Sequence, residues 1–474
     1  MKQERESLGS RLGFILLSAG CAIGIGNVWR FPWLAGQYGG GWFVLFYLLF
    51  LVLLGVPVMS MEFAAGRAAR RSPAGMFRQL ERPGAKWHWH GVVCFAGCAV
   101  LMMYYTTVAG WMLAYTQRCA AGAFEGMGAE EIGAAFGAFL GNPSAQVVPM
   151  VLVAAAGFGV CAMGLRAGLE RVAKWMMLAL LGLMLVLAGH SLLLKETAVR
   201  TGADGGTTVT GALDGLRYFL VPDAASVAAH GGWLRVLVEA MNQSFFTLSL
   251  GVGSMAIFGS YIGRDRALLG EAARVTALDT FVALCAGAII LPACFAFGVE
   301  PGAGPGLLFV TLPNIFNGMG AGRLWGTLFF VFMSFAAFST VLAVFENLVA
   351  CVRDLTGWSR RRAALAGIPV MCALSLPCAL GWSVLKGWRP FGEAWGILDM
   401  EDFVVSNMLL PLGSLVFVAF CCWRWGWGWE RFAAEANAGK GLKVRGWMRG
   451  YCAVVLPAAI LVLFGLGLWE KFGG

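Results

Sequence analysis

Eleven apolar segments recur along this 474-residue chain, each long enough to cross a lipid bilayer. A transmembrane helix needs about 20 residues at a rise of 1.5 Å per residue. Only 13% of the residues are charged, whereas a soluble protein carries roughly 25%. The mean hydropathy is +0.73. The pattern predicts an all-α polytopic membrane protein, with spans at residues 11–36, 41–66, 91–118, 147–165, 171–194, 234–261, 273–299, 323–352, 364–383, 400–424 and 448–470.

The stretches between these spans are rich in charged residues, Gly or Pro, and four of them are long. The long non-membrane insertions are residues 119–146, 195–233, 300–322 and 384–399, of which the last two leave room for short helices. The first segment continues directly into Asn27 and Trp33 without a small-residue cleavage site, so we expect a permanent span rather than a removed signal peptide.

Lys and Arg are distributed unevenly between the two sides, which predicts an orientation. The segments on one side include Arg5, Arg67 and Arg264, whereas the opposite insertion 119–146 holds three Glu and no Lys or Arg. We therefore expect the N-terminus in the cytoplasm and, after eleven crossings, the C-terminus outside. The same bias accounts for the net charge of +9, so this charge indicates no nucleic-acid partner.

Two spans carry a glycine motif at equivalent places. The first span contains Gly24-Ile25-Gly26-Asn27, and the sixth contains Gly251-Val252-Gly253-Ser254. Unwound backbone within a membrane is tolerated only where it lines a cavity or is buried in protein. Paired glycine interruptions in two halves of a chain point to a transporter site at the interface of inverted repeats. The alternative is close helix packing through a GxxxG-like face, but neither motif has that spacing.

Ionisable side chains inside the spans give a second indication, because they are costly in a bilayer and usually functional. Arg30 lies one turn outward of the first break, and Asp402 opens the tenth span on the same side, so we expect the two to pair above a central site. Ser339-Thr340 offers two hydroxyl oxygens midway along the eighth span, although such residues often bond their own helix carbonyls. The remaining intramembrane ionisable residues are Glu62, Glu239, Asp279 and Glu346.

Several motifs together resemble the neurotransmitter:sodium symporter family, which has the leucine-transporter fold. They run from the N-terminus to about residue 425 in conserved order. They comprise the segment from Arg11 through Asn27-Val28-Trp29-Arg30-Phe31-Pro32, then Gly39-Gly40-Gly41, Pro57 with Glu62, Tyr104-Tyr105, and Gln243 through Gly251. The resemblance implies two five-helix inverted repeats with broken helices 1 and 6, plus one extra helix. We expect residues 1–200 and 201–425 to form the repeats, and residues 426–474 a loop and the eleventh helix.

The resemblance also implies two sodium sites and a substrate site. One Na⁺ is expected to bind the Ala22 carbonyl, Asn27, Thr247 and Asp279, together with the substrate carboxylate. The second is expected to bind the carbonyls of Gly20, Ile23 and Ala336 and the hydroxyls of Ser339 and Thr340. The substrate carboxylate would meet Ile25, Gly26 and Tyr105, and its ammonium the carbonyls of Ala22, Phe246 and Thr247. The expected side-chain pocket comprises Leu101, Tyr105, Phe246, Ser249, Val252 and Val344.

Two gates follow from the same resemblance. Arg30 with Asp402 would form the outer gate, with Phe246 as its lid. Arg5 with Asp354 would form the inner gate, assisted by Tyr261. The chain departs from the family pattern at Leu8, where an aromatic residue is usual, and at Ala283, where a Ser or an acidic residue lies near the anion site. Because Asp279 would supply a fixed negative charge, transport is expected to be independent of chloride. Glu62 is expected to bond backbone amides freed by the breaks.

The function implied is sodium-coupled symport of an amino acid by a bacterial inner-membrane protein, with the monomer sufficient for transport. The apolar pocket favours medium to large hydrophobic L-amino acids, with Val252 leaving room beside the substrate. A same-fold symporter of another solute, such as an amine or osmolyte, is the first alternative. It is disfavoured because the first span lacks the acid of amine carriers. A receptor or channel is the second alternative, and an enzyme is least favoured because no nucleophile–base pair or metal cluster is evident.

Overall fold

The computed structural model describes residue 6 and residues 8–201, 207–229, 231–299, 306–392 and 395–472. Within these ranges nine helices are long and apolar enough to cross a membrane. One further crossing, the first in chain order, is the pair Arg11–Ala22 and Gly26–Gln37, which is bent by 54°. The predicted sixth span consists of two shorter helices, α12 (Gly232–Thr247) and α13 (Ser254–Gly259). The chain is thus a multi-pass membrane protein whose two irregular crossings are those that carry the glycine motifs.

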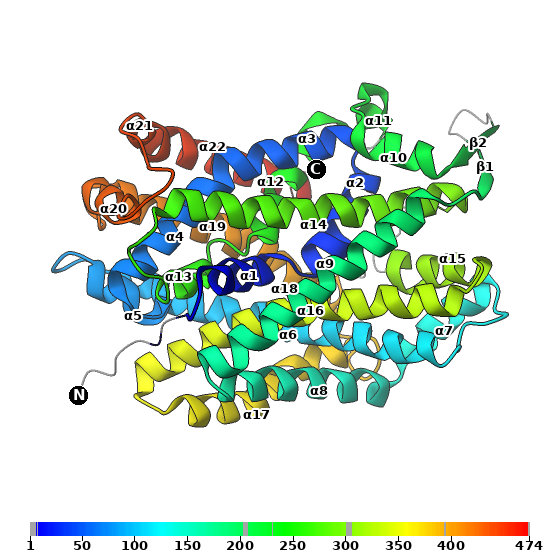
Figure 1. The fold of residues 1–474 in the computed structure, drawn as a ribbon, viewed down its shortest axis with the longest axis horizontal. Coiled ribbons are helices and arrows are strands. Elements are labelled where there is room, and N and C mark those ends of the chain that lie inside the picture. The colour runs from blue at the N-terminus through cyan, green and yellow to red at the C-terminus, as the bar shows by residue number, and fades with distance from the viewer. Residues whose placement is uncertain are drawn as a thin grey trace.

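The first five crossings form a bundle whose members run side by side in Figure 1. Their elements are α1 (Arg11–Ala22), η1 (Gly26–Arg30) and α2 (Phe31–Gln37); α3 (Gly41–Phe50), η2 (Leu51–Gly55) and α4 (Val56–Ala69); α6 (His88–Ala120); α8 (Pro143–Ala162); and η3 (Leu165–Glu170) with α9 (Arg171–Leu192). The η elements are short π-helical turns. Such turns insert one residue into a helix and are frequent at functional sites.

The remaining crossings begin with the broken pair α12 and α13. They continue with α14 (Leu268–Ala296), α16 (Gly322–Thr356), α17 (Arg360–Ala379), the run α18 (Ile397–Phe403), η5 (Val404–Leu409) and α19 (Leu410–Cys422), and the run α21 (Met448–Gly450), η6 (Tyr451–Val455) and α22 (Leu456–Phe472). Figure 1 shows α1 at the centre of the bundle, and α1 packs against α9, α14 and α16. The first break is therefore surrounded by protein rather than by lipid.

Shorter elements cover the two ends of the bundle. In Figure 1, α7 and α15 lie at the same end as a small hairpin, and α5 and α20 lie at the other. The antiparallel hairpin pairs Thr197 with Gly211. All four long insertions contain helical residues, whereas short helices were expected in only the last two. The elements within the insertions are α7 (Ala129–Gly141), β1 (Thr197–Thr201), β2 (Thr207–Gly211), α10 (Ala212–Leu220), α11 (Ala224–Ala229), η4 (Leu307–Thr311) and α15 (Leu312–Gly318), and the last insertion holds the start of α18. The other short helices, α5 (Pro73–Leu80) and α20 (Trp429–Ala436), lie in the loops after the second and tenth predicted spans.

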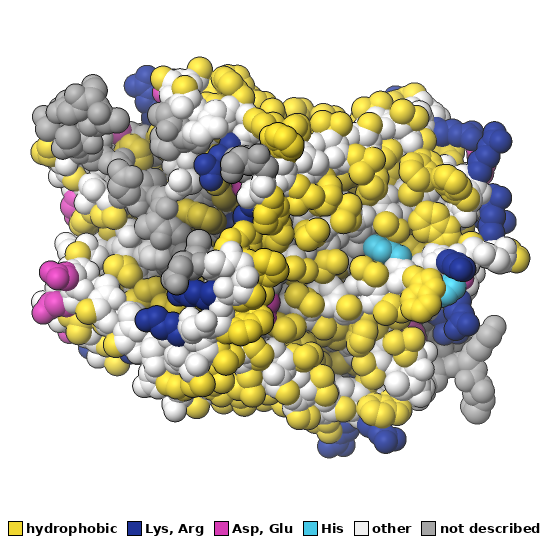
Figure 2. All heavy atoms as spheres, turned by 180° about the vertical axis from the view of Figure 1, so that it is seen from behind, with side chains coloured by type: hydrophobic (Ala, Val, Ile, Leu, Met, Phe, Trp, Pro, Cys, Tyr) yellow, Lys and Arg dark blue, Asp and Glu magenta, His cyan; other side chains and the backbone are white. Residues whose placement is uncertain are grey.

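The outer surface is apolar around the middle of the bundle and charged at its ends. Figure 2 shows hydrophobic side chains across the central zone, with Lys and Arg gathered most densely at the end that carries α5 and α20. Large exposed apolar side chains on membrane-facing helices include Val52, Trp175 and Val462. This surface suits a lipid environment, in which apolar side chains need no cover.

Candidate ion and substrate site

The first break lies between α1 and η1. The last helical residue is Ala22, and Ile23 is extended at φ −73° and ψ 96°. A side chain at Gly24 would collide with the hydroxyls of Thr340 and Tyr105. Glycine is therefore required where the unwound backbone passes between α6 and α16. The predicted break in span one is present.

The second break is residues 248–253, between α12 and α13. Ser249, Gly251 and Gly253 have positive φ values of 52°, 91° and 71°. A non-glycine residue with positive φ is uncommon and carries strain that is often found at functional sites. The buried Glu62 carboxylate accepts hydrogen bonds from the Gly251 amide (2.6 Å) and the Met255 amide (3.2 Å). The expectation that Glu62 bonds amides freed by a break is confirmed.

A buried carboxylate lies beside the first break. Asp279, on α14, is 0% exposed. Its Oδ1 accepts from Asn27 Nδ2 at 2.8 Å, and the Thr247 hydroxyl lies 3.1 Å from Oδ2. Tyr47 donates to Oδ2 at 3.4 Å. The structure thus brings together three side chains predicted for the first sodium site and adds Tyr47, which was not predicted.

The partners that the structure gives Asp279 are an amide, an alcohol and a phenol, all neutral. A buried carboxylate without a countercharge is strongly unfavourable. Asn27 Oδ1 and Thr247 Oγ1 are oxygens of the kind that hard cations prefer. A single positive charge bound beside Asp279 would therefore balance the site, and this donor set fits a small monovalent cation.

A second cluster of oxygens lies between α1 and α16. Ser339 Oγ is 2.9 Å from the Ile23 carbonyl and 2.8 Å from the Ala336 carbonyl. Thr340 Oγ1 is 3.4 Å from the Gly20 carbonyl. Each hydroxyl has one proton and bonds one carbonyl at a time, so the cluster retains unused oxygen lone pairs. All five residues predicted for the second sodium site meet here, and their oxygens suit a hard cation.

Between the breaks lies a cavity of about 20 Å³. None of the residues that form its described lining is charged. Tyr105 supplies a phenol that accepts a hydrogen bond from the Ile25 amide at 2.9 Å. Ser249 donates to the Cys21 carbonyl at 3.3 Å. The lining residues are Cys21, Ala22, Gly24, Gly26, Leu101, Tyr105, Phe246, Ser249, Thr340 and Leu410.

Six of the ten predicted substrate residues line this cavity, and four do not. Ile25 lines a neighbouring space on the outer side, and Thr247 is directed at Asp279. Val252 is 1% exposed, and its Cγ1 lies 3.0 Å from the position that a Cβ on Gly97 would take. It therefore packs against α6 instead of lining the cavity. Val344 is fully buried and is also outside the lining.

The two residues predicted for the outer gate are paired. Arg30 Nη1 lies 3.1 Å from Asp402 Oδ1, and the guanidinium stacks 4.6 Å above the centre of the Phe246 ring. Tyr104 donates to Asp402 Oδ1 at 3.1 Å. Phe246 and Tyr105 line both the cavity and a larger outer space of about 130 Å³. These two rings therefore separate the cavity from the outer space.

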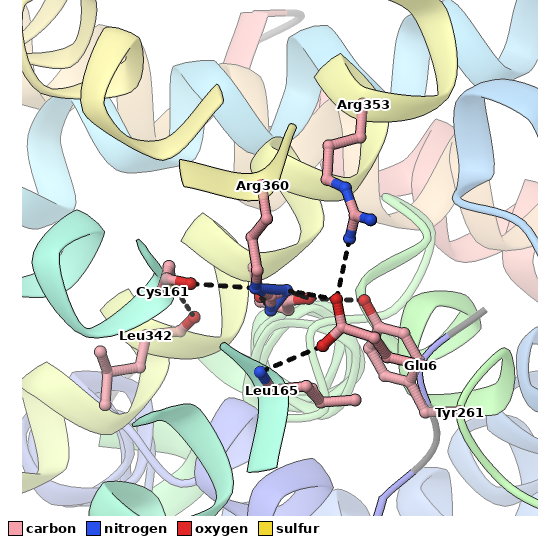
Figure 3. Close-up of polar contacts among 8 residues, drawn as sticks. Glu6, Cys161, Leu165, Tyr261, Leu342, Arg353 and Arg360 are labelled. Carbon is pink, nitrogen blue, oxygen red and sulfur yellow. Dashed lines mark hydrogen bonds and ion pairs between the residues drawn. The ribbon is translucent and has the colours of Figure 1, made fainter. Parts of the chain in front are cut away.

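The opposite side is closed by a network of ion pairs (Figure 3). The buried Glu346 accepts the Tyr261 hydroxyl at 2.5 Å and two hydrogen bonds from Arg360, at 3.0 Å and 2.5 Å. Glu6 Oε1 lies 3.2 Å from Arg353 Nη1. Glu6 Oε2 accepts the Leu165 amide at 3.2 Å. The network joins the N-terminal segment, η3, the turn after α13, α16 and α17.

The predicted inner gate is described only in part. Arg5 lies outside the described residues. Asp354 Oδ2 accepts the Ser72 amide at 2.6 Å, and Tyr261 is bonded to Glu346. Sequence reasoning did not assign Glu346 or Arg360 to this gate. The signal was available, because an acidic residue within a span requires a cationic partner, and Arg360 is only fourteen residues from Glu346.

The chain is similar to known transporters over nearly its whole length. The model of the sodium:neurotransmitter symporter family matches residues 5–125 and 135–471. The uncharacterized sodium-dependent transporter YhdH of Bacillus subtilis is 32% identical over 464 residues, which cover 98% of each chain. An uncharacterized sodium-dependent transporter of Haemophilus influenzae is 27% identical over 476 residues, again covering 98% of each.

Solved structures also share this architecture. The crystal structure of MhsT in complex with L-phenylalanine is 35% identical, has a TM-score of 0.85, and matches 98% of this chain and 99% of its own. This confirms the predicted fold class, which is two five-helix inverted repeats with broken helices 1 and 6 plus one extra helix. The family and the sodium-dependent relatives identify Na⁺ as the coupling cation. The oxygen clusters described above suit this ion. The chain belongs to the sodium:neurotransmitter symporter family and is a sodium-coupled secondary transporter.

Proposed function

We propose that the protein carries medium to large hydrophobic L-amino acids together with Na⁺. The observation that carries this proposal is the cavity between the two breaks, whose described lining combines backbone polar groups with Leu101, Phe246 and Leu410 and includes no charged side chain. A charged substrate side chain would be desolvated there without a partner, which is expensive. The similar MhsT, crystallised with L-phenylalanine, supports the same class of solute.

The amino-acid backbone of the substrate has partners at the two breaks. Free amides bind anions, and free carbonyls bind cations. In the proposed pose the carboxylate meets the Gly26 amide, the Tyr105 hydroxyl and the Na⁺ beside Asp279. The ammonium meets the carbonyls of Ala22, Phe246 and Thr247. Because the substrate carboxylate completes the first sodium site, substrate and ion stabilise each other, and this reciprocity couples their binding.

Alternating access follows from the contacts on either side of the cavity. Opening toward the outside requires Arg30 to leave Asp402, and opening toward the inside requires the Glu346–Arg360 network to separate. The concentration of Lys and Arg at the α5 and α20 end (Figure 2) supports that end as cytoplasmic. We therefore propose a bacterial inner-membrane protein with its N-terminus inside, its C-terminus outside, and repeats at residues 1–200 and 201–425. A single protomer contains the whole proposed site.

A substrate panel tests this assignment. Reconstituted protein on a solid-supported membrane reports electrogenic transport of any Na⁺-coupled solute without a label. We expect inward currents with L-leucine, L-isoleucine, L-phenylalanine and L-tryptophan under a Na⁺ gradient. Weak currents are expected with glycine, and none with L-glutamate or L-lysine. A preference for glycine, or for betaine and amines over all amino acids, would contradict the proposal.

Transport is expected to need Na⁺ but not chloride. The buried Asp279 carboxylate already supplies a fixed negative charge next to the bound Na⁺, so a mobile anion is unnecessary. Replacing chloride with gluconate should leave uptake in proteoliposomes within about two-fold of its original rate. Replacing Na⁺ with K⁺ is the positive control and should abolish uptake. A large loss in gluconate would contradict the role given to Asp279.

Thr340→Val is expected to weaken Na⁺ binding at the second site while leaving the fold intact. The substitution keeps the side-chain shape and removes one ligand oxygen, and adding Ser339→Ala removes another. A lost hydrogen bond to a charged group costs about 1.5–3 kcal/mol, so the Na⁺ concentration for half-maximal uptake should rise by roughly ten-fold or more. Thr327→Val on the same helix is a matched control, because its hydroxyl bonds only the Arg323 carbonyl. An unchanged Na⁺ midpoint in Thr340→Val would show that α16 does not bind the ion.

A further inference from the structure

The tenth crossing contributes a side chain to the cavity that none of the sequence motifs indicated. Leu410 begins α19, is 2% exposed, and lines the cavity with Leu101 and Phe246. These three are the only large apolar side chains in the described lining. The position of Leu410 therefore bears directly on the shape of the substrate that fits.

The backbone of α19 lies directly against the second break. A Cβ on Gly251 would lie 2.8 Å from the Ser414 nitrogen and would overlap the Leu410 carbonyl oxygen. A Cβ on Gly413 would lie 3.0 Å from the Gly251 Cα. Two glycines thus allow the two backbones to touch, so α19 has no room to move closer to the second break. Leu410, whose carbonyl is part of this contact, lies directly beside the break.

The π-helical turn η5 sets the direction of Leu410 relative to the outer gate. The Leu410 amide bonds the Val405 carbonyl, five residues earlier. In a regular helix Asp402 and Leu410 would be separated by about 80° around the axis, since each residue turns by about 100°. One inserted residue reduces the eight steps to an effective seven, which brings the two side chains within about 20° of each other. The gate carboxylate and Leu410 therefore share one face of the tenth crossing.

The neighbouring contacts place this face at the apolar part of the cavity. Gly97 lies one helical turn before Leu101 on α6. A Cβ on Gly97 would lie 3.0 Å from Val252 Cγ1 and 3.4 Å from Leu409 Cδ1. The α6 helix, the second break and the tenth crossing therefore meet at one junction. The Leu409 side chain packs within this junction and does not line the cavity, whereas Leu410 lines the cavity beside it.

We propose that Leu410 determines substrate specificity by limiting the size of the side chain that the cavity accepts. This inference rests on the proposed function and adds a residue of the tenth crossing to the site. A smaller residue at position 410 enlarges the apolar part of the cavity and favours bulkier solutes. A larger residue does the opposite.

The test compares half-saturating concentrations of L-tryptophan and L-valine in the current assay. Each methylene in an apolar pocket changes discrimination by roughly ten-fold or more. Leu410→Ala is expected to lower the tryptophan-to-valine ratio at least ten-fold, and Leu410→Phe to raise it. Leu409→Ala is the matched control, because it removes the same atoms from the adjacent residue, which lies outside the cavity lining. Its ratio should stay within about three-fold of the unsubstituted protein.

Equal shifts in Leu409→Ala and Leu410→Ala, or an unchanged ratio in Leu410→Ala, would overturn the proposal. If Leu410→Ala does not yield monodisperse protein, Leu410→Val removes one methylene and should shift the ratio in the same direction. The substrate class of the unsubstituted protein distinguishes a failure of the proposed function from a failure of the proposal for Leu410. If it transports another class of solute, the proposed function fails, and the ratio between a larger and a smaller member of that class still tests Leu410.

Discussion

Asp279→Asn is expected to remove Na⁺ coupling almost completely while the protein still folds. The substitution keeps the shape and hydrogen-bonding capacity of the side chain but deletes the only charge in the first sodium site. Removing one partner of a buried ion pair costs about 3–5 kcal/mol. The Na⁺ concentration for half-maximal transport should therefore rise by at least about 100-fold, at about 1.36 kcal/mol per factor of ten.

Two measurements distinguish this effect from misfolding. Without Na⁺, thermal unfolding of Asp279→Asn in detergent should occur at or above the temperature of the unsubstituted protein, because an uncompensated buried charge has been removed. Added Na⁺ should stabilise the unsubstituted protein and have much less effect on the variant. Asp214→Asn is the control, since its exposed carboxylate only bonds the Gly211 amide at the start of α10. A normal Na⁺ midpoint in Asp279→Asn would contradict the ion assignment.

Gly251→Ala is expected to cause a large loss of stability and of transport. Gly251 has a φ of +91°, and its added Cβ would overlap backbone atoms of the tenth crossing. The left-handed conformation costs an L-residue about 1–2 kcal/mol. Forcing an extra carbon into a packed contact costs about 1–3 kcal/mol more. The total of roughly 2–5 kcal/mol should appear as a clearly lowered unfolding temperature.

Gly232→Ala separates the two contributions. Gly232 has a similar φ of +81°, but nothing lies within 4 Å of its Cβ position. It should therefore show only the conformational cost. If Gly251→Ala and Gly232→Ala unfold at the same temperature, the close contact between the second break and α19 does not contribute to stability.

The architecture and most of the ion site could be predicted from the sequence because they depend on strong local signals. Glycines paired with small and polar residues marked both breaks, and acidic or hydroxyl residues within apolar spans marked Asp279, Ser339 and Thr340. The bilayer makes such residues costly, so each of them is informative. Fold class and the identity of the coupling ion followed directly from these signals and from the family resemblance.

The side-chain pocket was harder to predict, because apolar residues carry no comparable signal in an apolar chain. Val252 was expected in the cavity but packs against Gly97, whereas Leu410 lines the cavity. The orientation of Leu410 depends on the π-helical turn at Val404–Leu409. One inserted residue rotates all the following side chains of the helix by about 100° around its axis. The composition of Val404–Leu409 does not distinguish this turn from an ordinary α-helix.

The inner network was missed for a different reason. Its members come from segments distant in sequence, from Glu6 to Tyr261, Glu346 and Arg360, and the pairing of Glu346 with Arg360 is fixed by the turn between α16 and α17. In the sequence, the positive charges indicated only an orientation and gave Arg360 no partner. The tertiary arrangement brings this arginine to Glu346 and close to Glu6 (Figure 3).

Sodium-driven accumulation of a hydrophobic amino acid tests the central claim most directly. Proteoliposomes with low internal Na⁺ are given radiolabelled L-phenylalanine and external Na⁺, and the internal concentration is followed over time. We predict that L-phenylalanine rises well above its external concentration and then falls back when an ionophore dissipates the Na⁺ gradient. Equilibration to the external concentration, at the same rate with Na⁺ or K⁺ outside, would contradict sodium-coupled transport of this substrate.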